Sequence, residues 1–333
     1  MIFHKASRRD LLTAGAWALA TVAAAPAASW AQSPGSFPNK TLTFVVPYPA
    51  GGANDMLGRL IGQKMAEALG GSAIIDNRPG AAALLGAGVV ARAPADGHTL
   101  LVGGLATHAA SPHMLKADYD PLKDFEPVGL IGSAPIIAIT YLDSPFKTLK
   151  DVVDAAQKDP NAVMYGSSGN GSPLHLAGEM FSDLAKVNLT HVPYKGGNAH
   201  ILDLIGGRVP VIFDTATNCM PLLKAGKVRA LAVGAGTRLA DLPQVPTFAE
   251  SGYPQFDFSA WYAIFVPAKT PKPVVAKLSS ALGTSLKNPD VVARLNSVGI
   301  TVATGDSATL ARFLPAEHER IGRLIKAANI KPD

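Results

Sequence analysis

The chain has 333 residues, a formal net charge of +5 at pH 7, 48% hydrophobic residues, 17% charged residues and a single cysteine. This apolar, weakly charged composition excludes a disordered chain, and one cysteine excludes both an internal disulfide and a cysteine-rich zinc site. The basic residues form no dense run, so we expect no nucleic-acid partner, and the length favours about two domains.

The N-terminal segment, residues 1–31, has the organisation of a secretory signal peptide. Arg8 and Arg9 precede an alanine-rich apolar stretch that is short for a membrane span, and small residues precede an expected cleavage after Ala31. The paired arginines also fit twin-arginine export, so the export route stays open. Removing the segment, with its three Lys and Arg and its one Asp, lowers the formal charge from +5 to +3. We therefore expect a periplasmic protein without a transmembrane segment, in which Cys219 is a buried, inert thiol.

Strand and helix patterns alternate along the rest of the chain. The first block is predicted as strand 41–46, helix 54–69, strand 73–75, helix 82–92 and strand 99–102. The second block is predicted as helix 149–157, strand 163–165, helix 172–185, strand 189–193, helix 199–205 and strands 211–213 and 228–233. Two further helices are predicted at 273–286 and 309–328. This alternation predicts an α/β fold with a mostly parallel sheet.

Two long apolar runs, residues 128–142 and 256–266, separate these blocks. We interpret them as two crossings of the chain between two α/β lobes. The first lobe would comprise residues 32–135 plus 262–333 and the second residues 136–261. The lobes would be joined by two hinge strands, with a cleft between them.

The loop Pro47–Asp55 follows the first predicted strand and precedes a helix. Gly51 and Gly52 permit a tight turn and the close approach of a ligand, and Asn54 or Asp55 can cap the helix. Free backbone N–H groups and the helix dipole favour an anion at such a place. The alternative is a plain glycine turn with an N-cap.

The loop Tyr165–Pro173 has the same position in the second block. It offers three glycines and the hydroxyls of Ser167, Ser168 and Ser172. Ser172 before a proline suits an N-cap followed by proline at the first helical position. This loop could also bind an anion; the alternative is a flexible turn.

Two more loops follow predicted strands. One, Gly103–Pro112, carries Thr107 and His108, and the other, Phe213–Thr217, carries Asp214. Open α/β sheets bind ligands beyond the carboxyl ends of their strands. Four such loops, shared between two lobes, therefore predict a ligand-binding cleft.

Motifs for common enzyme chemistry are missing from the sequence. There is no Walker A motif, no dinucleotide fingerprint and no nucleophile elbow, and the eight histidines have no metal-ligand spacing. We therefore expect no metal and no cofactor. A triad of Ser168, His175 and Asp214 stays open, because triad members need not be close in sequence. An exported serine hydrolase is thus one alternative, and a ligand-binding sensor for a signalling system is another.

Eight motifs in order give the mature chain a resemblance to a known family. They are VVPYPAGGAND at 45–55, DNRPG at 76–80, DGHTL at 96–100, YGSSGNGS at 165–172, HVPYKG at 191–196, GKVRAL at 226–231, LPQVPT at 242–247 and ESGY at 250–253. Together they resemble the tripartite tricarboxylate transporter substrate-binding proteins, also called the Bug or TctC-like family.

The resemblance implies a non-enzymatic periplasmic solute-binding protein with a Venus-flytrap fold. Such a protein would be monomeric, would capture a di- or tricarboxylate or an aromatic acid, and would deliver it to the membrane permease subunits of a tripartite transporter. The family binds one carboxylate near a G-G-x-x-D loop, which corresponds to Gly51, Gly52 and Asp55. Ala50 replaces a proline common in the family, and residues 215–218 are less typical, so the identity of the carboxylate stays open.

Combining the loops with the resemblance gives the expected ligand-binding set. It consists of Tyr48, Ala50, Gly51, Gly52, Asp55, Thr107, His108, Ser167, Ser168, Ser172 and Asp214. Within it, we expect Asp55 to cap a helix or hold a water rather than contact an anion directly. Trp261 is expected to pack in the core.

Overall fold

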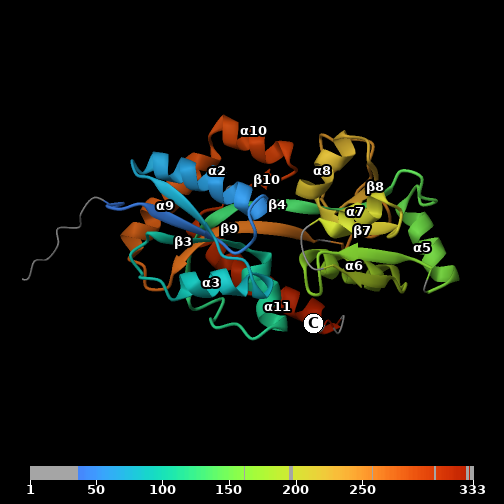
Figure 1. Ribbon diagram of the computed structural model, residues 1–333, viewed down its shortest axis with the longest axis horizontal. Helices are drawn as coiled ribbons and strands as arrows, with labels where there is room; N and C mark the ends of the chain where they lie inside the picture. The colour runs from blue at the N-terminus through green and yellow to red at the C-terminus, as the bar shows by residue number, and fades with distance from the viewer. Residues whose placement is uncertain are drawn as a thin grey trace, which may run out of the picture. The chain divides into compact units, whose positions relative to one another are not determined.

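The computed structural model describes residues 37–160, 162–194, 198–256, 258–303, 305–327 and 330. The predicted signal peptide lies outside these residues. From Lys40 onward the described chain belongs to one unit, in which strands and helices alternate as the sequence predicts (Figure 1). In the described part, no helix is both long and apolar enough to cross a membrane.

The first group of elements surrounds a short parallel sheet. It comprises β1 (Leu42–Val46), α2 (Ala53–Ala68), β2 (Ala73–Asn77), the 3-10 turn η1 (Ala81–Ala83), α3 (Leu84–Ala91), β3 (Thr99–Gly104), the π-helical turn η2 (Ala106–Ala110) and α4 (Ser111–Met114). β1 pairs in parallel with β2 and β3. Gly58 and Gly62 face the sheet: a Cβ at Gly58 would lie 2.7 Å from Val46 and one at Gly62 would lie 3.0 Å from Phe44. These glycines therefore let α2 lie close against β1.

The second group repeats the pattern. It comprises α5 (Leu149–Lys158), β5 (Met164–Ser167), α6 (Pro173–Ala185), β6 (Thr190–Pro193), α7 (Ala199–Ile205), β7 (Val211–Thr215), α8 (Ala216–Lys224) and β8 (Val228–Val233). β5 pairs in parallel with β6 and β7. Cys219 lies on α8 and is 1% exposed, and burial raises the pKa of its thiol. The prediction of a buried thiol is confirmed.

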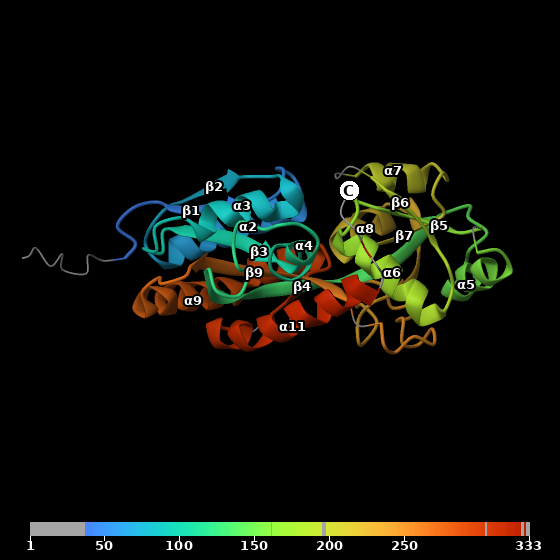
Figure 2. The same ribbon diagram turned by 90° about the horizontal axis from the view of Figure 1, so that it is seen from below.

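Two long strands connect the groups: β4 (Phe125–Tyr141) and β9 (Ser259–Pro267). They pair antiparallel from Phe125 opposite Pro267 to Pro135 opposite Ser259. Beyond Pro135, β4 pairs with β7 and β8 instead. The sheet order is β2-β1-β3-β9-β4-β7-β5-β6, so β4 continues from one group to the other (Figure 2). We call the elements on the β1–β3 side the first lobe and those on the β5–β8 side the second lobe.

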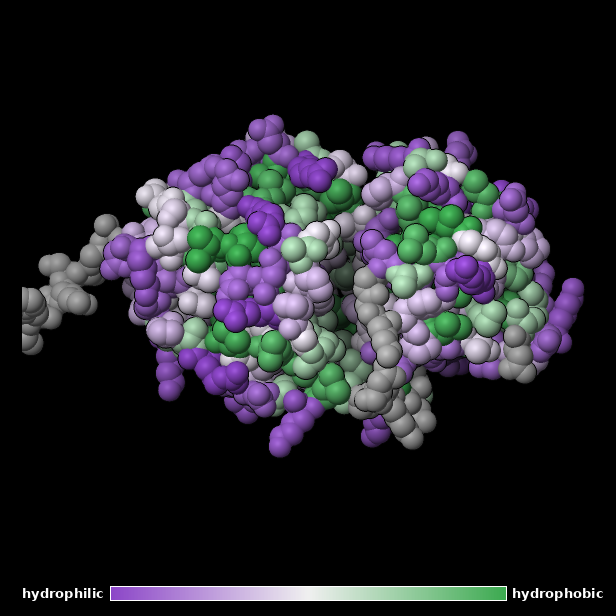
Figure 3. Space-filling model, in the orientation of Figure 1, coloured by the Kyte–Doolittle hydropathy of each residue, from purple (hydrophilic) through white to green (hydrophobic). Residues whose placement is uncertain are grey.

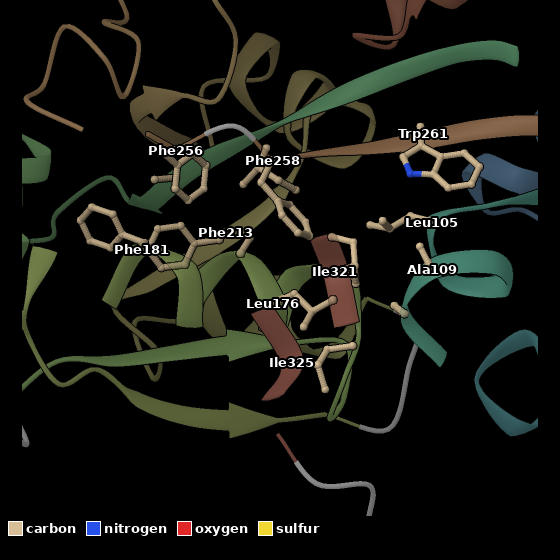
Figure 4. Packing of buried hydrophobic residues seen from close by; sticks show 14 of the residues in the cluster. Leu105, Ala109, Leu176, Phe181, Phe213, Phe256, Phe258, Trp261, Ile321 and Ile325 are labelled. Atoms are coloured by element: carbon tan, nitrogen blue, oxygen red, sulfur yellow. The ribbon is translucent and has the colours of Figure 1, made fainter. Parts of the chain in front are cut away.

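The C-terminal helices return to the first lobe. They are α9 (Lys272–Leu286), α10 (Pro289–Ser297) and α11 (Ser307–Ala327), with the short strand β10 (Thr301–Val302) between the last two. α9 packs on α2, whereas α11 packs along β4 and η2 and also touches α6. Ile321 and Ile325 of α11 join one hydrophobic cluster with Leu176 and Phe181 of the second lobe (Figure 4). The core is therefore continuous between the lobes.

Three expectations from the sequence differ from the structure. The sheet is mixed rather than mostly parallel, because the crossings β4 and β9 run in opposite directions. The crossings also begin and end at other residues than predicted, 125–141 and 259–267. The segment Gly103–Pro112, predicted as a loop, is largely the helical turns η2 and α4. Its alanines favour helix, and Pro112 occupies the first turn of α4, where its missing N–H costs no hydrogen bond.

Candidate ligand-binding cleft

A cavity of about 590 Å³ lies between the lobes, within the range of small-molecule sites. Figure 3 shows the surface hollowed between them. The first lobe and β9 contribute Tyr48, Pro49, Ala50, Gly51, Gly52, Ala53, Asn54, Met56, Gly104, Leu105, Ala106, Ala260, Trp261, Tyr262, Arg294 and Val298. The second lobe contributes Pro173, Leu174, Asn198, Thr215, Thr217 and Asn218. Four of the predicted site residues, Tyr48, Ala50, Gly51 and Gly52, therefore lie in the cavity wall.

The loop between β1 and α2 forms one side of the cavity. Gly51 has φ +91°, a conformation that side chains disfavour, and an added Cβ would meet no described atom within 4 Å. Gly52 is the N-cap of the 16-residue helix α2, and among the described residues no side chain caps it. The first turn of α2 thus presents backbone N–H groups and the positive end of the helix dipole to the cavity.

Asp55 lies behind this loop rather than in the cavity wall. It is 5% exposed. Its carboxylate accepts hydrogen bonds at 3.0 Å from the Gly51 N–H, from Arg59 and from Asn77. The hydrogen bond from Arg59, more than any other contact, holds the pKa of Asp55 below its usual range. Asp55 is therefore a fixed anion that holds the loop in shape.

The serines of the second-lobe loop are not among the residues that line the cavity. Ser167 is fully buried, and its hydroxyl lies 2.7 Å from His191 Nε2 and accepts from the Gly169 N–H. Ser172 caps α6 by accepting from the His175 N–H, as the sequence predicts. Ser168 is half-buried. The cavity wall itself takes Pro173 and Leu174 from this segment.

Asp214 lies behind the second-lobe part of the cavity wall and holds two residues of that wall by hydrogen bonds. Its side chain is fully buried and accepts hydrogen bonds from the Thr215 N–H at 2.6 Å and from Asn218 Nδ2 at 3.0 Å. His200 Nε2 lies 2.9 Å from its second oxygen. Asp214 thereby positions Thr215 and Asn218, which face the cavity.

Thr107 and His108 are fully buried inside the first lobe. The Thr107 hydroxyl accepts from the Gly104 N–H at 3.0 Å and lies 2.8 Å from His108 Nδ1. The His108 ring stacks on Phe265 with centroids 3.7 Å apart. Burial, with a smaller effect of His318, lowers the pKa of His108 to about 3. His108 is therefore a neutral packing residue at neutral pH.

The structure does not bring the hypothetical hydrolase triad together. Within the described residues, Asp214 bonds His200 rather than His175. His175 Nδ1 instead accepts the Gly171 N–H at 2.9 Å, and its ring stacks on His191. Among the described residues, no three His, Cys, Asp or Glu side chains are grouped to hold a metal ion.

Eight polar or aromatic residues in the cavity wall were not foreseen as ligand contacts: Asn54, Asn198, Thr215, Thr217, Asn218, Trp261, Tyr262 and Arg294. Trp261 is 3% exposed and packs edge-on against Phe313, as expected of a core residue. Its indole Nε1, however, finds no hydrogen-bond partner among the described residues. In Figure 4 this nitrogen lies on the side of the ring toward Leu105, a further cavity residue.

Two tyrosines in the wall are neutral donors. Burial is the main cause that raises the pKa of Tyr262, to about 12, while Thr217 lowers it and Asp214 raises it. Burial also raises the pKa of Tyr48, with a contribution from Tyr262. The described wall thus offers chiefly neutral donors: backbone N–H groups, hydroxyls, amides and an indole.

The sequence profile of the tripartite tricarboxylate transporter family receptor matches residues 57–330. The chain belongs to this family. A relative in Pseudomonas sp. strain P51, the UPF0065 protein in the tcbD-tcbE intergenic region, is 36% identical over 319 residues, which are 96% of this chain and 94% of that protein. The resemblance stated from the motifs is therefore confirmed.

Solved structures of the family agree with the fold. The R. palustris protein Rpa4515 with adipate has a TM-score of 0.82 at 34% identity, covering 89% of this chain and 100% of that one. The periplasmic binding protein BugD has 0.80 at 32%, covering 89% and 100%. MatC from Rhodopseudomonas palustris with bound malate has 0.78 at 35%, covering 87% and 100%. The chain is a periplasmic solute-binding protein of this family with a two-lobe Venus-flytrap fold.

Proposed function

We propose that the chain captures an organic carboxylate between its lobes and delivers it to the membrane permease subunits of a tripartite tricarboxylate-type transporter. The observation that carries the proposal is the cavity at the carboxyl ends of β1, β3 and β7, faced by the uncapped N-terminus of α2. The structural neighbours with adipate and malate support a carboxylate as its ligand. We further propose export through residues 1–31, a first lobe of 32–135 plus 262–333, a second of 136–261, and a monomer.

One ligand carboxylate would bind the loop of Ala50, Gly51 and Gly52 and the first turn of α2. Charge-assisted hydrogen bonds of this kind contribute about 1.5–3 kcal/mol each. Asn198, Thr215 and Asn218 of the second lobe would bind the rest of the ligand. Because only the closed arrangement brings both sets of donors to one ligand, binding would favour closure.

The other expected site residues would act by positioning. Asp55, Ser167, Ser172 and Asp214 hold backbone or side-chain groups at the edge of the cavity. We propose no catalytic role for them and no cofactor, since transport needs only reversible binding.

A ligand screen tests this function. The mature protein, residues 32–333, would be heated with adipate, malate, citrate, phthalate and benzoate, with dimethyl adipate as the uncharged control. A ligand at 100 times its Kd should stabilise the folded state by about 2.7 kcal/mol and raise the Tm, whereas the diester should not. The proposal fails if no acid raises the Tm while the protein hydrolyses simple esters.

A further inference from the structure

Arg294 brings a full positive charge to the cavity. It lies on α10 with an exposed side chain. It is the only charged residue among the described residues that line the cavity. The rest of the described wall can neutralise an anion only through dipoles and neutral donors, so Arg294 changes which anions the site can hold.

Helix α10, which carries Arg294, is firmly anchored to the first lobe. Asn288 caps the helix, with its Oδ1 accepting from the Asp290 N–H at 2.9 Å. Val291 and Leu295 are fully buried and fix the helix on the first lobe. The backbone around Arg294 is therefore ordered before any ligand arrives.

The chain just after α10 also touches the second lobe. Gly299 has φ +73°, and a Cβ there would lie 2.5 Å from the Cβ of Ala216, the first residue of α8. In Figure 1, α10 and α8 lie next to each other above the sheet. Thr217 and Asn218 of α8 line the cavity, so Arg294 lies at the place where the second-lobe wall meets the first lobe.

The Arg294 guanidinium has no ion-pair partner in the described part of the chain. Asp290, one helical turn earlier, forms none with it. Ser297 donates to the Arg294 backbone carbonyl, and among the described residues the guanidinium itself forms no hydrogen bond. A guanidinium carries five N–H donors in a planar fork that matches a carboxylate in two-point contact.

We propose that Arg294 binds the second acid group of a dianionic ligand whose first acid group lies on the β1–α2 loop. This inference rests on the proposed function and adds selectivity to it. A monoacid is satisfied by the neutral donors of the loop and gains nothing from Arg294. A diacid carries a second negative charge, and Arg294 is the cation in the described wall that can pair with it. The site should therefore prefer diacids.

The test compares matched acids and matched variants by calorimetric titration of the mature protein. The acid pairs are adipate with hexanoate and phthalate with benzoate, and the variants are Arg294→Gln, Arg294→Lys and the control Arg312→Gln. Arg312 is an exposed arginine on α11 outside the cavity wall, so its variant makes the same change in net charge. Melting of each variant checks that it folds.

We expect Arg294→Gln to weaken binding of the preferred diacid at least about tenfold and that of the monoacid less than about twofold. Arg294→Lys should recover part of the loss, and Arg312→Gln should bind both acids like the wild type. The diacid affinity should also fall more steeply with added salt in the wild type than in Arg294→Gln.

Three results would overturn the assignment. One is a wild type that binds the monoacid of a pair as tightly as the diacid. Another is an Arg294→Gln variant that loses affinity for both acids equally, and a third is a variant that loses none. In each of these the wild type still binds acids, so the proposed function survives. A wild type that binds no acid at all overturns both proposals.

Discussion

Trp261 offers an internal probe of the cavity. The chain has three tryptophans. Two of them, Trp17 and Trp30, lie in the predicted signal peptide, so the mature protein would carry Trp261 alone. Because Trp261 lines the cavity, intrinsic fluorescence of the mature protein reports on the cavity wall directly.

We expect the emission of Trp261 to change when a carboxylate binds, because its Nε1 is a buried donor without a partner in the described residues. Trp261→Phe keeps an aromatic ring against Phe313 but removes the donor together with part of the buried indole. It should weaken binding about tenfold, the worth of one hydrogen bond to a charged group, and lower the Tm because a small cavity is left. Equal affinity in calorimetry would show that the nitrogen serves packing only.

The sequence predicts which loops lie at the cavity better than it predicts which of their side chains point into it. Tyr48 and Gly51 were expected at the ligand and do line the cavity, whereas Asp55 and Asp214 stand behind the wall and fix what lines it. A strand-end loop indicates where ligands bind, but not which side chains turn inward. Arg294 gave no such signal, since tertiary packing alone brings α10 to the cleft.

At the scale of elements, the shape of the β1–α2 loop depends on Gly51. Gly51→Ala meets no steric clash in the described residues but places a side chain at φ +91°. We expect the loop to relax and ligand affinity to fall at least about tenfold, with about 1–2 kcal/mol lost in stability.

Gly252→Ala is the matched control for that prediction. Gly252 has φ +97°, an added Cβ there is likewise free of described atoms within 4 Å, and the residue is outside the cavity wall. Urea unfolding should show similar destabilisation of both variants, while titration should show weaker binding for Gly51→Ala alone. If both variants keep wild-type affinity, the loop is not part of the ligand site.

The helices α8 and α10, which the sequence patterns did not predict, are short and have weak helix signals in the sequence. α8 contains Pro221 and begins immediately after β7, with Thr215 serving as both strand end and N-cap. α10 has nine residues, and the exposed Ala293 and Arg294 lie between its buried Val291 and Leu295. The strongly apolar elements were foreseen because burial imposes a period on the sequence. These two helices follow from contacts that only the assembled lobes provide.

For the whole molecule, His108 makes stability depend on pH. Its folded-state pKa of about 3 lies below the unfolded value of 6.5, so the unfolded chain binds more protons between these values. The stabilisation is complete above about pH 6.5 and is lost as the pH falls toward about 3, by about 1.4 kcal/mol per pH unit. Urea unfolding of the wild type should therefore show a loss of about 2 kcal/mol between pH 7 and pH 5.

The variant His108→Gln distinguishes the contribution of His108 to the pH dependence of stability from that of the other histidines. The variant should flatten the curve between pH 7 and pH 5 whatever its own stability at pH 7. An unchanged slope in the variant would assign the pH dependence elsewhere, and a flat wild-type curve would contradict the burial of a neutral ring.

Because β4 runs unbroken from one lobe to the other, a ligand needs to supply little free energy to change the angle between the lobes. The strand exchanges its partner β9 for β7 at Pro135 and Ile136, and a proline has no N–H to lose there. A change in the angle between the lobes can thus be taken up as twist within one strand, while the backbone N–H and C=O groups on either side keep their partners. We therefore expect open and closed arrangements to lie close in free energy, so that a few hydrogen bonds to one small anion would suffice to select between them.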